Sequence, residues 1–127
     1  MVEARAFDRC EYCLTHVDDA LVGCEVDHII SEKHGGVTIA ENLAFSCAYC
    51  NRRKGTDVGS VTAIGQFVRF FNPRTDTWHE HFAVRRARIE SVTEIGWVTV
   101  KVLGFNEPDR VEERAILQAA KRFPSKG

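Results

Sequence analysis

The chain has 127 residues, of which 44% are hydrophobic and 28% charged, and its formal net charge is −1. This composition is ordinary for a water-soluble globular protein and predicts a single domain over residues 1–127. It excludes a positive field over the whole molecule, so a site for a polyanion must be built from local clusters of basic residues.

No apolar run approaches the roughly 20 residues of a membrane span, and no apolar signal segment follows Met1. We therefore expect a cytoplasmic protein with no membrane partner. The compartment decides how the five cysteines are interpreted. Cytosolic disulfides are rare, and paired cysteines in such chains more often bind metal.

Two C-x-x-C pairs, Cys10 with Cys13 and Cys47 with Cys50, predict a metal site. In such a pair a tight turn lets both thiolates reach one ion, and two pairs complete a tetrahedral four-thiolate zinc site. The alternative is that the cysteines are small buried hydrophobic residues, which two pairs at the same spacing disfavour. A fully ligated ion has no open position, so this zinc is expected to be structural. We interpret Cys24 as a buried strand residue rather than a fifth ligand.

The segment between the two pairs is expected to form two strands and a helix. Residues 26–30 and 42–46 read as strands, residues 31–36 as a loop, and residues 50–55 as a short helix that ends at Gly55. Closed by zinc, this arrangement brings four polar residues near one another: Asp27, His28, Asn42 and Asn51.

The remainder of the chain predicts a mixed extension over residues 58–127. Turn residues separate short apolar runs up to about residue 92, which indicates strands such as Phe67–Phe71. Residues 95–105 fit both a helix and a strand, and we favour the helix. Pro108 suits a first helical turn, and an apolar stripe is expected to follow it at Val111, Ala115, Ile116, Ala119, Ala120 and Phe123.

At residues 10–55 the chain resembles the zinc-containing branch of the HNH endonuclease family. The matching elements, in order, are the first C-x-x-C, the run Asp27-His28-Ile29-Ile30, the pair Gly35-Gly36, Asn42-Leu43, and the second C-x-x-C followed by Asn51 and Lys54. The resemblance implies an α+β protein with a small ββα-metal core over residues 7–57, stapled by a four-cysteine zinc site. It also implies metal-dependent hydrolysis of DNA to 5′-phosphate and 3′-hydroxyl ends.

The family's roles carry over residue by residue. His28 would be the general base, and Asn42 would hold the backbone that orients it. Asp27 and Asn51 would bind the catalytic metal. Because Asn51 stands where many relatives have histidine, both ligands are oxygen donors, which favours Mg²⁺ or Mn²⁺. No small-molecule cofactor is implied.

The expected partner is DNA, and either a monomer or a homodimer is compatible with the sequence. The residues expected to contact phosphate are Arg52, Arg53 and Lys54, and His34 fits a phosphate contact and a solvated loop residue equally well. Two further basic clusters, residues 85–88 and 121–122, fit a DNA track or a solvated face equally well. His79 and His81 could bind metal, but we favour helix packing or an edge contact to substrate. The alternative function is a zinc-stapled module that binds nucleic acid, or a protein partner, without cutting.

Overall fold

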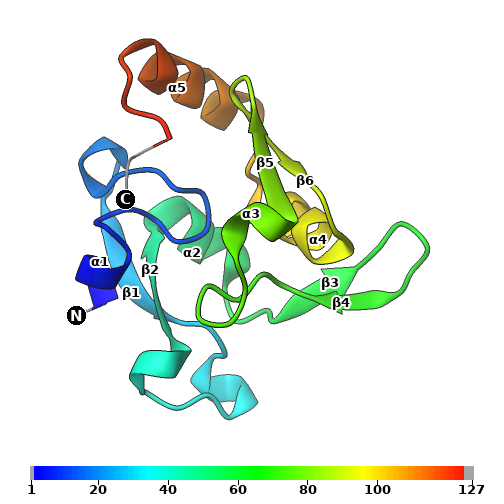
Figure 1. Ribbon diagram of the computed structural model, residues 1–127. Coiled ribbons are helices and arrows are strands. Elements are labelled where there is room, and N and C mark those ends of the chain that lie inside the picture. Colours follow the sequence, from blue (N-terminus) through cyan, green and yellow to red (C-terminus); the bar gives the residue numbers. More distant parts are fainter. Residues whose placement is uncertain (1, 125–127) are drawn as a thin grey trace.

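A computed structural model describes residues 2–124 (Figure 1). The protein is a mixture of short helices and strands, as the α+β prediction required. In chain order its elements are α1 Val2–Arg5, η1 Val17–Asp19, β1 Cys24–His28, η2 Glu32–His34, η3 Ala40–Asn42, β2 Leu43–Cys47, α2 Ala48–Lys54, β3 Gly59–Val61, β4 Phe67–Arg69, α3 Trp78–His81, β5 Phe82–Arg85, β6 Arg88–Ser91, α4 Glu94–Leu103 and α5 Pro108–Ala119.

The expected strand–loop–strand–helix unit is present, with shifted boundaries. β1 and β2 pair antiparallel from Cys24↔Cys47 to His28↔Leu43, and α2 follows β2 without a loop. β1 ends before Ile30 because both backbone groups of that residue bond the side chain of Asn42 instead of a strand partner. Asn42 itself closes the 3₁₀ turn η3, so β2 begins one residue later than expected.

Within residues 2–124 three two-stranded antiparallel sheets form: β1–β2, joined through η2 and η3, and the hairpins β3–β4 and β5–β6. The predicted strand at residues 67–71 is confirmed only as far as Arg69. Phe70 and Phe71 leave the strand and enter the core, where they are 4% and 3% exposed. Their aromatic rings therefore anchor the β3–β4 hairpin to the rest of the molecule.

Helix α4 confirms the helical interpretation of residues 95–105. It begins where the hydroxyl of Thr93 accepts a hydrogen bond from the Gly96 backbone amide, and it ends at Gly104 in the left-handed conformation. Its buried side packs on β6 and on the β3–β4 hairpin.

Helix α5 begins at Pro108 as predicted, but the apolar stripe expected along it is wrong. Ile116 is 64% exposed, whereas the buried residues of this helix are Arg110 and Arg114. Only Phe123, beyond the helix end, is buried as expected. The face turned to the core therefore carries two guanidinium groups.

One core cluster joins the cysteine region to the extension. The indole of Trp78 donates a 2.8 Å hydrogen bond to the carbonyl oxygen of Tyr12, between the first two cysteines. Glu11 in the same turn accepts from the Phe45 amide at 3.0 Å and forms an ion pair with Arg74. The extension thus buttresses the turn that carries Cys10 and Cys13.

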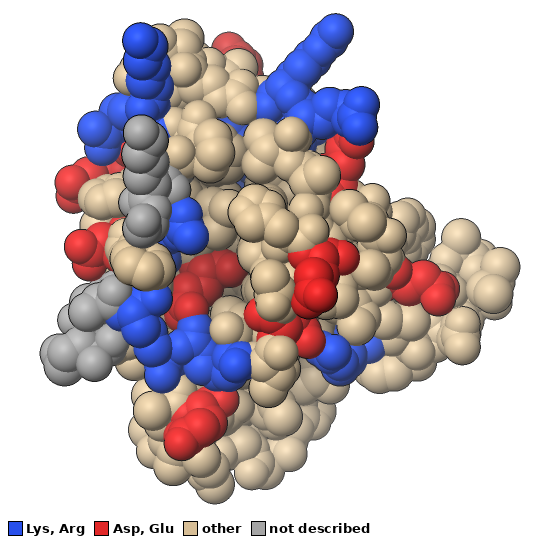
Figure 2. Space-filling model, viewed as in Figure 1, with Lys and Arg blue, Asp and Glu red and all other residues tan. Residues whose placement is uncertain are grey.

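Charge is distributed unevenly over the surface. In Figure 2, Lys and Arg side chains gather around the tip of the β5–β6 hairpin at the top and in a band at the lower left, while the protruding β3–β4 hairpin is largely uncharged at its tip. Within residues 2–124, no helix is long and apolar enough to cross a membrane.

Candidate functional site

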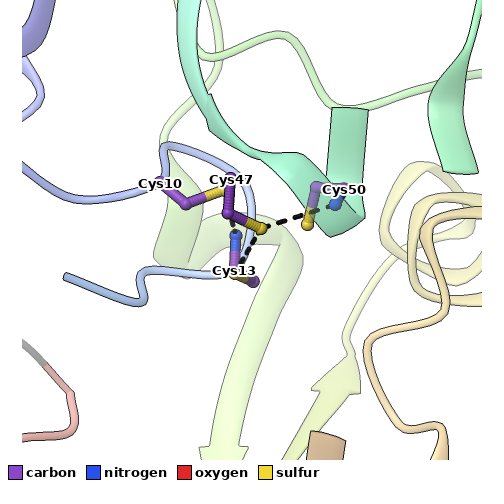
Figure 3. Close-up of side chains that lie close together, drawn as sticks. All are labelled: Cys10, Cys13, Cys47 and Cys50. Atoms are coloured by element: carbon purple, nitrogen blue, oxygen red, sulfur yellow. Dashed lines mark hydrogen bonds between the residues drawn. The ribbon is translucent and has the colours of Figure 1, made fainter. Parts of the chain in front are cut away.

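The four cysteines of the two C-x-x-C pairs converge on one point. Their sulfur atoms all lie within 4.8 Å of one another, and all four residues are buried. Two come from the turn before η1, and two from the junction of β2 and α2 (Figure 3). Within each pair the later backbone amide points at the earlier sulfur, at 3.5 Å for Cys13 to Cys10 and 3.4 Å for Cys50 to Cys47.

This geometry fits a tetrahedral zinc ion. Zn–S bonds of about 2.3 Å place the sulfurs of a four-thiolate site roughly 3.8 Å apart. The Sγ atoms of Cys13 and Cys47 are 3.8 Å apart, far longer than a disulfide bond. Hydrogen bonds from Cys10, Cys47 and Cys50 hold the pKa of Cys13 well below the usual thiol value, which favours the thiolate that zinc requires.

Cys24 stands apart from this group, as expected. It is half-buried on β1, opposite Cys47 in the strand register, and it is not part of the four-sulfur cluster. Burial, with the nearby Cys10 and Cys13, raises the pKa of Cys24 to about 12.

The end of β1 carries His28, and a loop hydroxyl contacts its ring. Nε2 of His28 lies 2.8 Å from Oγ1 of Thr38, in the segment between η2 and η3. When Nε2 carries the proton and donates it to that hydroxyl, Nδ1 is left unprotonated and able to accept a proton. Because a threonine hydroxyl both donates and accepts, the Thr38 contact orients the ring, and the tautomer with the proton on Nε2 is the one that a base requires.

Asn42 holds the loop that carries Thr38. Its Oδ1 accepts from the Ile30 amide, and its Nδ2 donates to the carbonyl oxygens of Ile30 and Val37, each at 2.9 Å. Gly36 is required at this turn, because a Cβ there would lie 1.7 Å from the Ile30 oxygen. Asn42 thus connects both ends of the loop next to His28.

Asp27 points to the opposite side of β1 from His28, towards α2. Its Oδ2 atom is buried and has no hydrogen-bond partner within residues 2–124. The nearest cation is the ammonium of Lys54, 3.9 Å away, which also donates to the His28 carbonyl oxygen at 3.2 Å. Burial raises the pKa of Asp27 and lowers that of Lys54, and each charge opposes the shift of the other.

Asn51 lies one helical turn before Lys54 on α2. Its Nδ2 donates a 3.0 Å hydrogen bond to Oε1 of Glu25, two residues before Asp27 on the same face of β1. The two expected metal ligands therefore both lie where β1 packs against α2. Asp27 faces Lys54, whereas Asn51 bonds Glu25. Glu25 was not anticipated from the sequence.

The four expected phosphate contacts differ in how they meet solvent. Arg52 and His34 are exposed. Arg53 is also at the surface, but it is committed to the protein, donating to the Val102 carbonyl and pairing with Glu107. The sequence suggested Lys54 as a surface contact, but its side chain is only 2% exposed. Its ammonium is buried against β1 and is not accessible to a phosphate.

The histidine pair of the extension lies on α3, not on a strand. Nδ1 of His81 is 2.6 Å from the Thr93 hydroxyl, and its ring packs against Phe71. His79 is exposed and stacks edge-on against Trp78. Neither joins a metal-ligand cluster in the described part of the chain, which agrees with the preference for a packing role.

The region that holds the four clustered cysteines matches a known protein family. The family model of HNH endonuclease matches residues 10–57, from the first cysteine to just beyond α2. This confirms the resemblance of that region to HNH proteins with C-x-x-C turns. Neither the curated proteins nor the solved structures give a match to this chain.

Proposed function

With an HNH region over residues 10–57 as the premise, we propose that the protein is a metal-dependent DNA endonuclease that leaves 5′-phosphate and 3′-hydroxyl ends. The observation that carries the proposal is the pairing of two features at the end of β1. His28 has its Nε2 engaged by Thr38, and the neighbouring Asp27 has a buried oxygen with no hydrogen-bond partner in the described chain.

His28 is the general base in this proposal. With Nε2 bound to Thr38, Nδ1 takes a proton from the attacking water. Thr38 and Asn42 do not touch the reacting atoms. They fix the ring and the loop, and so act as positioning residues.

Asp27 and Asn51 are the proposed ligands of the catalytic ion. Oδ2 of Asp27 accepts no hydrogen bond within residues 2–124 and faces only the Lys54 ammonium at 3.9 Å, so it offers a carboxylate oxygen of the kind that a hard ion binds. The bond from Asn51 to Glu25 uses Nδ2, so the amide oxygen Oδ1 of Asn51 would be its ligand atom. Such an ion supplies Lewis-acid stabilisation of the charge that develops on the phosphate and the leaving 3′ oxygen.

The buried Lys54 contacts both the proposed base His28 and the proposed metal ligand Asp27. Its ammonium bonds the carbonyl of His28 and faces the carboxylate of Asp27, so one buried cation fixes the strand end that carries base and ligand. This replaces the phosphate contact expected for Lys54. Arg52 and His34 remain the proposed phosphate contacts of the HNH region.

The alternative is a binding module that keeps the zinc scaffold but does not cut. A module of that kind needs neither a histidine oriented by a hydroxyl nor, next to it in the strand, a carboxylate oxygen without a hydrogen bond. The two are separated by incubating supercoiled plasmid with purified protein, with and without Mg²⁺ or Mn²⁺, and analysing the product ends. Metal-dependent nicks sealable by DNA ligase support the endonuclease. Retarded but uncut plasmid under all these conditions supports the binding module.

A further inference from the structure

Helix α5 buries charge where its sequence pattern predicted apolar residues. Arg110 is 9% exposed and Arg114 is 3% exposed, while Ile116 faces solvent. Within residues 2–124, no carboxylate lies within 4.0 Å of either guanidinium. A buried charge is costly unless an opposite charge compensates it. The two arginines therefore require an anion inside the protein.

The sulfur cluster is that anion for Arg110. Nη2 of Arg110 lies 3.5 Å from Sγ of Cys50 and 3.8 Å from Sγ of Cys47. Its guanidinium stacks on Tyr49, 4.1 Å from the ring centroid. Nη1 donates to the Leu103 carbonyl at 3.2 Å. Tyr49 and the Leu103 carbonyl thus hold the guanidinium of Arg110 in place, with Nη2 directed at the sulfur atoms of Cys47 and Cys50.

Arg114 lies one turn further along α5 and contacts only neutral groups. It donates to the carbonyl oxygens of Ala87 and Phe105, each at 2.8 Å. These bonds use Nη1 and Nη2, while the buried Nε has no hydrogen-bond partner within residues 2–124, and none of them cancels the charge. Burial lowers the pKa of Arg114, and the charges of Cys13 and Cys50 oppose that shift.

The charges balance when zinc is bound. Four thiolates exceed one divalent ion by two negative charges, and the two buried arginines supply two positive charges. We propose that Arg110, with Arg114 behind it, is the counter-ion of the zinc tetrathiolate, so that the retention of zinc depends on this buried charge. The proposal depends on zinc at the four cysteines and not on nuclease activity.

The counter-ion role has one consequence. The guanidinium edge on Cys47 and Cys50 withdraws charge from these sulfur atoms, which disfavours their protonation and so slows the loss of zinc to a chelator.

Zinc release tests the proposal directly. Zinc-loaded full-length protein is mixed with excess EDTA, and the zinc that remains bound is measured over time by elemental analysis after gel filtration. Arg110→Met keeps the apolar stem and removes the charge. We expect it to release zinc at least 10-fold faster than the unmutated protein, in line with the effect of outer-shell partners on metal affinity. Lys101→Met, at an exposed cation on α4, is the control and should leave the rate unchanged.

Arg110→Lys separates charge from packing. It restores a cation without the planar fork, so its release rate should lie closer to that of the unmutated protein than to that of Arg110→Met. An unchanged rate in Arg110→Met would overturn the proposal, as would a lysine variant no slower than the methionine variant. If Arg110→Met yields no zinc-bearing protein, the lysine variant decides. Release within about 3-fold of normal supports the counter-ion, and faster release contradicts it.

Discussion

Replacing Thr38 with valine removes the hydroxyl 2.8 Å from Nε2 of His28 and leaves the side-chain volume nearly unchanged. One hydrogen bond contributes about 0.5–1.5 kcal/mol net, which corresponds to roughly 2- to 13-fold in rate if it acts in the transition state. Both groups are partly open to water, so we expect the lower half of that range. Loss of the base itself costs about 10²–10⁴-fold. Thr38→Val should therefore slow cleavage measurably without abolishing it.

Initial rates of nicking of a supercoiled plasmid provide the assay, with the enzyme limiting and kcat and KM obtained from the dependence on DNA concentration. The loss should fall on kcat, because the contact orients a base and does not bind substrate. Thr38→Ser retains the hydroxyl and should recover most of the rate. Thr75→Val, at an exposed threonine in the loop before α3, is the matched control. Full activity in Thr38→Val would refute the orienting role of this hydroxyl.

Three further predictions concern the scaffold and the DNA contacts. Cys47→Ser should abolish zinc binding and cooperative melting, since structural zinc supplies on the order of 10 kcal/mol to a fold whose total stability is about 5–15 kcal/mol; an equally stable zinc-free protein in a thermal scan would contradict this. Arg52→Gln should reduce the slope of log affinity against log salt by about one unit. Arg53→Gln should leave that slope unchanged and lower Tm instead. If Arg53→Gln changes the slope and Arg52→Gln lowers Tm, the two roles are exchanged. Lys54→Met leaves a buried carboxylate without its cation and should lower the free energy of unfolding in urea by about 1–3 kcal/mol, with a loss of cleavage that the exposed control Lys101→Met does not share.

The metal site could be predicted because its information is local. A C-x-x-C spacing places two thiolates on one ion whatever surrounds them, and the four sulfurs do converge. The order of Asp27, His28, Asn42 and Asn51 between and beside those pairs identified the HNH region in the same way. Motif order survives errors of one or two residues in strand boundaries.

The partners of those residues could not be predicted, because they depend on contacts between distant segments. Lys54 reads as one more basic residue in a run, yet the packing of α2 on β1 buries it. Thr38 stands in a loop without periodicity, and only the Asn42 bonds place its hydroxyl next to His28. A closer look at the Gly35-Gly36 pair could have indicated a tightly folded loop at this point.

Helix α5 shows the limit of hydrophobic patterning most clearly. A stripe through Val111 and Ile116 fits a helical period, but the opposite side is buried. The sulfur cluster provides a buried anion that accepts Arg110 and so reverses the usual preference. Nothing in the local sequence of the helix reports a charge that lies 60 residues earlier in the chain, at Cys50.

The central claim is that His28 is the base of a metal-dependent nuclease, and one comparison tests it most directly. Plasmid nicking in Mg²⁺ or Mn²⁺ is measured for the unmutated protein, for His28→Ala and for His79→Ala, an exposed histidine on α3, at equal zinc content. We predict a loss of about 10²–10⁴-fold in His28→Ala and normal nicking in the control. Robust metal-dependent cleavage by His28→Ala would contradict the account.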